Sequence, residues 1–129
     1  TNDARREQLL PRAPRIAIAE LVERGEQYAR ATGYPIQYQW TLLAGINDGE
    51  DELEGIVELL RGKYAILNMI PYNRVEGFDH ERPSDERCTA IFRTLNQRGV
   101  LMRLRQSAGQ DVDAGCGQLR ARVIALRAA

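Results

Sequence analysis

Hydrophobic and polar positions along the chain follow a helical period and a strand-like pattern in turn. Three amphipathic stretches carry apolar residues at helical spacing, and they predict helices over residues 14–32, 50–61 and about 84–98. Shorter stretches, apolar throughout or alternating with polar residues, predict strands over 36–43, 64–70 and 100–105. A last segment, 113–127, also has a helical pattern. Strands and helices that alternate at this spacing indicate βα units around a parallel sheet.

Short polar residues and glycines mark the expected helix ends. Asp48 is the expected N-cap of the second helix and Ser84 that of the third, because their side chains can accept a hydrogen bond from a free backbone N–H. Gly33, Gly62 and Gly99 follow the last apolar positions of the three helices, where glycine ends a helix at no steric cost.

The composition fits one small α/β unit. The 129 residues are 43% hydrophobic and include 18 basic and 18 acidic side chains, so we expect a packed core and no general nucleic-acid signature in the charge. No apolar run is long enough to span a bilayer, and we expect no membrane partner. Two cysteines are too few for a disulfide framework, which favours a reducing, cytoplasmic compartment. The start at Thr1 rather than Met leads us to expect a fragment of a longer protein.

Candidate chemistry gathers where the predicted strands end. Right-handed crossovers would bring the loops 44–49, 71–83 and 106–116 to one rim of the sheet, where α/β folds usually carry their sites. In the third loop Cys116 stands between Gly115 and Gly117, which leaves its sulfur accessible to a large reactant.

Three polar residues inside the predicted strands also need an explanation. Gln37, Gln39 and Asn68 would be costly in a dry core without partners. One interpretation is that this face of the sheet borders a polar cleft. The other is that these side chains bond one another or water.

Four motifs in order carry a resemblance to a known family. They are Gly45-Ile46-Asn47-Asp48, Asn68-Met69-Ile70-Pro71-Tyr72-Asn73, Glu81-Arg82-Pro83-Ser84 and Asp111-Val112-Asp113-Ala114-Gly115-Cys116-Gly117-Gln118-Leu119. Together they resemble the carboxy-terminal half of the RlmN/Cfr family of radical S-adenosylmethionine RNA methyltransferases. The resemblance covers essentially all of residues 1–129 and implies half of a partial (β/α) TIM-like barrel.

The resemblance implies cofactors that this chain holds only in part. The missing amino-terminal half would carry a Cys-x3-Cys-x2-Cys motif for a [4Fe–4S] cluster, and this chain has no such run of thiolates and no metal site. We therefore expect the isolated fragment to be inactive, and its exposed barrel edge to promote self-association. In the family a cysteine at the position of Cys116 carries the methyl group, which passes as a carbon radical to an adenine ring carbon.

The residues agree with that role for Cys116 on two counts and oppose it on one. Its flanking glycines and the nearby predicted helix start favour an accessible thiolate. Asp111 and Asp113 would raise the pKa of its thiol if they lay close, and an inert loop cysteine is the plain alternative.

Cys88 lies on the apolar face of a predicted helix and is interpreted as core. His80 is interpreted as a solvated loop residue, without partners for a metal.

Two further residues match functional positions of the family. Asn73 matches an asparagine that contacts S-adenosylmethionine, with an ordinary turn asparagine as the alternative. Arg105 matches a recurrent arginine at the rim, which we interpret as a contact to phosphate or to a loop, with a surface salt bridge as the alternative.

The sequence departs from the family pattern at several positions. The family pattern Asn-Pro-x-Pro-Gly is Asn73-Arg74-Val75-Glu76-Gly77 here, and Ala-Ala-Cys is Ala114-Gly115-Cys116, which indicates a divergent branch. The leading hypothesis is part of an enzyme that methylates adenine C2 in 23S rRNA, with tRNA as a further substrate. The alternative is an RNA- or protein-binding module that has lost catalysis.

Overall fold

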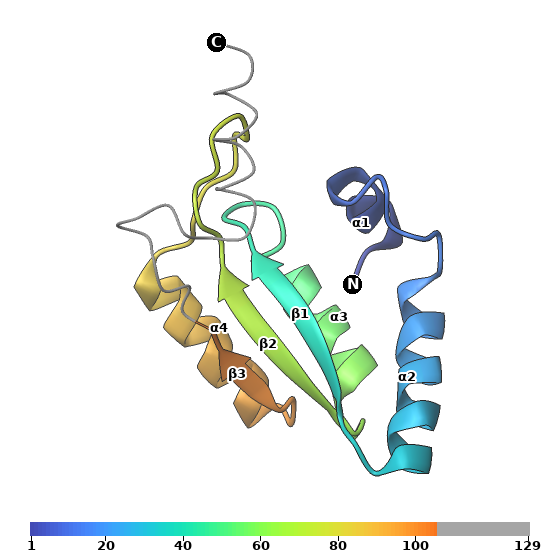
Figure 1. Ribbon diagram of the computed structural model, residues 1–129. Coiled ribbons are helices and arrows are strands. Elements are labelled where there is room, and N and C mark those ends of the chain that lie inside the picture. Colours follow the sequence, from blue (N-terminus) through green and yellow to red (C-terminus); the bar gives the residue numbers. More distant parts are fainter. Residues whose placement is uncertain (106–129) are drawn as a thin grey trace.

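The computed structural model describes residues 1–105, and these form a three-stranded parallel sheet with helices (Figure 1). The strands are β1 (Ile36–Leu42), β2 (Ala65–Pro71) and β3 (Met102–Leu104), in the order β1-β2-β3. The helices are α1 (Asp3–Leu9), α2 (Ile18–Thr32), α3 (Glu50–Leu60) and α4 (Asp85–Gln97). This confirms the predicted α/β class with parallel strands alternating with helices. The helix predicted over 113–127 lies outside the described residues.

The strand register divides the sheet into an apolar and a polar face. Ile36 pairs with Ala65, and Leu67 pairs with Met102, so alternate residues of all three strands lie on a common face. On one face Trp40, Leu42 and Met69 are buried against the helices. With them α3 and α4 complete the core through Leu53, Ile56, Val57, Leu60, Cys88, Ile91 and Leu95.

The opposite face carries mainly polar side chains and has no described helix against it. Gln37, Gln39 and Thr41 of β1 share it with Asn68 of β2 and Arg103 of β3. In Figure 1 this face is turned toward the viewer, with α3 behind the sheet and α2 beside β1. The outer edge of β1 pairs with no strand among residues 1–105.

The helix ends agree with the sequence at Ser84 and at the three predicted glycines, Gly33, Gly62 and Gly99, and differ at Asp48. Ser84 Oγ accepts a hydrogen bond from the N–H of Arg87 at 3.1 Å, which confirms the cap of α4. Gly33 ends α2 in the left-handed conformation at φ 78°, also as predicted. The prediction for Asp48 is wrong, because Gly49 is the N-cap of α3 and Asp48 Oδ1 instead accepts from Gly45 N–H at 2.9 Å.

Helix α2 begins four residues later than the pattern predicts, because side chains of α1 form hydrogen bonds with the backbone of residues 14–18. The guanidinium of Arg6 donates to the carbonyl of Pro14 at 3.2 Å and to that of Ile16 at 3.3 Å. The N–H of Ile18 donates to Asp3 Oδ1 at 2.8 Å, so a carboxylate of α1 caps a helix distant in sequence. The hydrophobic pattern does not predict helix α1, a short helix whose N-cap is Asn2.

No helix within residues 1–105 is both long and apolar enough to cross a membrane.

Truncation of Leu53 is expected to test the core between α3 and the sheet. Leu53 is 1% exposed and belongs to the central cluster. Leu53→Ala removes buried methyl groups and leaves a cavity, so it should lower the free energy of unfolding by about 2–5 kcal/mol. Urea denaturation followed by circular dichroism measures this. Glu58→Ala, at an exposed position of the same helix, is the control and should change it by less than about 0.5 kcal/mol. A loss below about 1 kcal/mol for Leu53→Ala would contradict this packing.

The thiol of Cys88 is expected to react slowly in the folded chain. Its side chain is 3% exposed, and burial raises the pKa of its thiol, so little reactive thiolate forms at neutral pH. In a Cys116→Ser variant, where Cys88 is the sole cysteine, a disulfide reagent should label the native chain slowly and the urea-unfolded chain rapidly. Equal rates in both states would show that Cys88 is accessible.

Candidate functional site

The carboxyl ends of the three parallel strands bring the predicted rim segments together. Tyr72 N–H donates to the carbonyl of Leu42 at 3.0 Å, and Ala44 N–H donates to the carbonyl of Glu81 at 3.0 Å. These bonds tie the loop after β1 to the loop after β2. The rim therefore holds the first two predicted loops side by side, and Arg105, the last described residue, lies next to β2. The third predicted loop, 106–116, lies outside the described residues.

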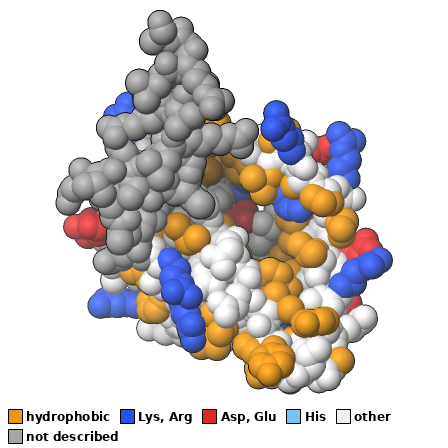
Figure 2. Space-filling view, in the orientation of Figure 1, with side chains coloured by type: hydrophobic (Ala, Val, Ile, Leu, Met, Phe, Trp, Pro, Cys, Tyr) orange, Lys and Arg blue, Asp and Glu red, His pale blue; other side chains and the backbone are white. Residues whose placement is uncertain are grey.

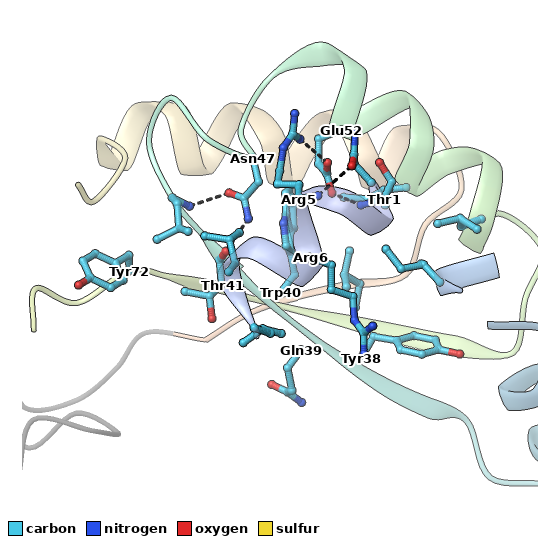
Figure 3. Close-up of a pocket in the computed structure, with 18 of the residues that line it drawn as sticks. Thr1, Arg5, Arg6, Tyr38, Gln39, Trp40, Thr41, Asn47, Glu52 and Tyr72 are labelled. Carbon is cyan, nitrogen blue, oxygen red and sulfur yellow. Dashed lines mark hydrogen bonds and ion pairs between the residues drawn. The ribbon is translucent and has the colours of Figure 1, made fainter. Parts of the chain in front are cut away.

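Asn47 shapes the loop that follows β1. This residue is 7% exposed, its Oδ1 accepts from Leu43 N–H at 2.7 Å, and its Nδ2 donates to the carbonyl of Thr41 at 2.8 Å (Figure 3). Gly45 adopts φ 69°, which glycine tolerates best. The Gly45–Asp48 motif thus forms a tight turn with its polar side chains bonded to backbone groups.

The loop after β2 is held by aromatic packing. The ring of His80 lies edge-on to Tyr72 with centroids 5.7 Å apart, and it stacks on Phe78 at 6.4 Å. Tyr72 is buried, and its hydroxyl oxygen accepts from Val75 N–H at 3.2 Å. The interpretation of His80 as a solvated residue is corrected: this side chain is only partly exposed, because two aromatic rings cover it.

Asn73, the candidate cofactor residue, follows directly after the buried Tyr72. It is partly buried at the rim, and its Oδ1 accepts from Arg82 Nη1 at 3.4 Å. Arg82 also contacts Asp85 Oδ1 at 3.3 Å, at the start of α4. The Glu81–Ser84 motif therefore places a charged side chain against Asn73, an arrangement that sequence reasoning did not find.

Arg105, the second candidate, is fixed to the sheet at two points. Its N–H donates to the carbonyl of Met69 at 2.8 Å, and its Nε donates to Asn68 Oδ1 at 3.0 Å. Within residues 1–105 Arg105 has no ion pair, so the described chain gives it an amide partner in place of the surface salt bridge considered from sequence.

Asn68 resolves the question of the polar strand residues in favour of both interpretations. It is fully buried, and its Nδ2 lies 3.3 Å from the carbonyl oxygen of Tyr38 and 3.5 Å from Gln37 Oε1. Polar strand side chains therefore do bond one another. Gln39, in contrast, lines a cavity beside β1, so part of this face does border a cleft.

The cavity lies along the unpaired edge of β1, between the sheet and helices α1 and α2. It encloses about 830 Å³. Figure 2 shows hydrophobic side chains gathered in this region, and Figure 3 shows the polar groups at one side of it. Its apolar lining includes Leu9, Leu10, Ile18, Leu21, Val22, Ile56, Leu59 and Leu60.

Two buried polar groups mark the wall of this cavity. Trp40 is 8% exposed, and its indole Nε1 has no hydrogen-bond partner within the described part of the chain. Glu52 is 4% exposed and pairs with Arg5 Nη1 at 2.7 Å and with the amino group of Thr1. Sequence reasoning missed Glu52, because three acidic residues at a helix start ordinarily face solvent, and only the packing of α1 buries this one.

Cys116, the proposed methyl carrier, lies outside the described residues. Among residues 1–105 no group of three or more His, Cys, Asp or Glu side chains is arranged to hold a metal ion. The described rim thus supplies amide and guanidinium groups, which bind polar and anionic ligands, and a cluster would need ligands from elsewhere.

Comparisons with known proteins place this rim in a chemical context. No protein-family model matches the chain. The chain is 70% identical over 120 residues to a probable RNA methyltransferase of Leptothrix cholodnii, covering 93% of this chain and 35% of that protein. It is 63% identical over 122 residues to a probable RNA methyltransferase of Stutzerimonas stutzeri, covering 95% and 36%.

Solved structures agree with these relatives. A radical SAM methyltransferase from Sphaerobacter thermophilus matches with a TM-score of 0.85 and 37% identity, covering 93% of this chain and 35% of that one. A domain of a pyruvate-formate lyase-activating enzyme from Bacteroides vulgatus shares the fold, with a TM-score of 0.63 and 18% identity over 81% of this chain and 62% of that one. The chain therefore corresponds to about a third of the length of proteins named probable RNA methyltransferases, and it has the fold of the matching part of a radical SAM methyltransferase.

Proposed function

We propose that this chain forms part of the active site of a radical S-adenosylmethionine enzyme that methylates an adenine carbon, C2, of RNA. The observation that carries the proposal is the match to the Sphaerobacter radical SAM methyltransferase over 93% of the chain, together with relatives named probable RNA methyltransferase. The sequence motifs support the finer assignment, with 23S rRNA as the main substrate and tRNA as a second one. A cytoplasmic location follows from such substrates.

The rim residues fit S-adenosylmethionine in part. Asn73 presents an amide at the carboxyl edge of the sheet, where it can both donate to and accept from a methionine or ribose group. Arg82 occupies one side of Asn73 Oδ1 and thereby orients the amide. When bound, S-adenosylmethionine supplies the methyl group, and with an iron–sulfur cluster it supplies the radical chemistry of the family.

The described residues do not fit the cluster. No group of acidic, histidine and cysteine side chains within 1–105 could hold a metal, so the cluster ligands belong to a part of the protein beyond these residues. We propose that Cys116 carries the methyl group on its sulfur. An accessible thiolate is the nucleophile that this transfer needs, and Cys88 is too deeply buried to serve.

The open edge of β1 adds a second element to the proposal. Its backbone groups pair with no strand among residues 1–105, and the apolar cavity runs beside it. An unpaired edge next to apolar surface favours association, so we expect the 129-residue chain alone to self-associate. We also expect this chain alone to have no methyltransferase activity, because its described residues hold no cluster ligands.

The carrier role of Cys116 is tested in the full-length protein with a reconstituted cluster. Cys116→Ala should abolish methyl incorporation into 23S rRNA, because Cys88, the other cysteine of this chain, is buried and cannot take the methyl group. Cys88→Ala is the matched control and should keep most of the activity. Transfer of a labelled methyl group measures both variants, with the 129-residue chain alone as the inactive reference.

Full activity of the Cys116→Ala variant would overturn the carrier assignment. Absence of cluster absorbance and of reductive S-adenosylmethionine cleavage in the unmodified protein would favour the alternative, a binding module without catalysis.

The cofactor role of Asn73 predicts a separate loss. Asn73→Ala removes an amide that can bond S-adenosylmethionine, and it should weaken S-adenosylmethionine binding by about tenfold, equivalent to about 1.4 kcal/mol. Calorimetric titration of the full-length protein measures this affinity. Arg74→Ala, at the exposed neighbouring position, is the control and should leave it within about twofold. Unchanged affinity in Asn73→Ala would assign Asn73 to an ordinary turn.

A further inference from the structure

The polar face of the sheet carries a network that links all three strands. Asn68 of β2 accepts from Arg105 Nε at 3.0 Å, and it donates toward the carbonyl of Tyr38 at 3.3 Å and Gln37 Oε1 at 3.5 Å, both on β1. Asn68 is completely buried and occupies the middle of the central strand. A buried amide with bonds on both its oxygen and its nitrogen has a fixed orientation, and its oxygen therefore faces Arg105.

This network orients an exposed guanidinium. The backbone N–H of Arg105 donates to the carbonyl of Met69 at 2.8 Å and so extends the pairing of β3 with β2. Its side-chain Nε donates to Asn68 Oδ1. Both terminal nitrogens of Arg105 have no hydrogen-bond or ion-pair partner among residues 1–105, and the side chain is exposed. A guanidinium held at its backbone and at Nε loses little further freedom when its two outer nitrogens bind an oxyanion as a fork.

The charge around this group favours an anionic ligand. Among residues 1–105 the side-chain partner of Arg105 is a neutral amide, so no carboxylate in this part of the chain compensates its positive charge. Arg103 lies two positions earlier in the same strand direction and therefore on the same face. The strand residues on this face are Gln37, Gln39, Thr41, Ile66, Asn68, Ile70 and Arg103, none of them acidic.

We propose that Asn68 is a positioning residue that holds Arg105 so that its two outer nitrogens bind a phosphate of the RNA substrate. This inference rests on the proposed function for the identity of the ligand. Arg105 follows β3 at the carboxyl rim, on the side where Asn73 lies, so a phosphate bound there would place an RNA strand across the rim. Asn68 acts only through Arg105 and does not touch the RNA.

The test uses the full-length protein and a labelled in vitro transcript of 23S rRNA, with binding and methylation measured separately. Arg105→Ala should weaken RNA binding by about tenfold and reduce the salt dependence of binding by about one phosphate contact. Asn68→Leu should weaken binding to a similar extent, because Arg105 loses its orientation. Affinity for S-adenosylmethionine should stay within twofold in both variants.

A double variant separates positioning from folding. If Asn68 acts through Arg105, adding Asn68→Leu to Arg105→Ala should cause no further loss of RNA affinity. Thr41→Val, at an exposed position of the same face outside this network, is the matched control and should bind RNA within twofold of the unmodified protein. Thermal unfolding of each variant checks the fold, and Arg105→Ala keeps the test valid if Asn68→Leu does not fold, because Arg105 is exposed.

Three outcomes would overturn the inference. They are RNA affinity unchanged in Arg105→Ala, additive losses in the double variant, and a loss of S-adenosylmethionine affinity in place of RNA affinity. The last would assign the guanidinium to the cofactor's carboxylate. Failure of the proposed function is a different result, in which the unmodified protein binds RNA with this Asn68 and Arg105 dependence but transfers no methyl group.

Discussion

Parallel pairing of β2 with a strand on each side is the constraint on which the candidate site depends. In this register Met69 lies between Trp40 and Leu104, and Asn68 lies between Gln39 and Arg103. The two residues are neighbours in sequence and point to opposite faces, so the same strand fills the apolar core and forms the polar face. A register shift of one residue would exchange these faces and bury the polar side chains among the helices.

The rim loops take their positions from this sheet through backbone hydrogen bonds. The N–H groups of Tyr72, Ala44 and Arg105 each bond a carbonyl of a neighbouring strand or loop. Because the strands are parallel, these bonds bring the chain to the same rim after each strand. The rim can therefore combine side chains from distant parts of the sequence, such as Asn73 and Arg105, in one functional surface.

Beside β1, the structure depends on charged side chains of α1 that bind α2 and α3. Helix α1 covers the start of α3 and places Arg5 against the buried carboxylate of Glu52, while Asp3 caps α2. A buried charge is stable only when it is paired, so α1 and α3 depend on each other. Next to them the cavity leaves the edge of β1 and the indole N–H of Trp40 without partners among the described residues. Within the described residues, this edge therefore keeps hydrogen-bonding groups without partners.

The sequence by itself determined the order of the strands and of the helices from α2 to α4, the parallel α/β class and the cap at Ser84, because these depend on local periodicity and on side chains near in sequence. It also pointed to Asn73 and Arg105, through short motifs next to strand ends. Only the tertiary structure decided that Asp48 closes a turn, that α1 caps α2, that Glu52 is buried, and that Asn68 holds Arg105. Each of these is a hydrogen bond or a burial between groups whose proximity depends on the packing of the whole chain, and no local pattern encodes it.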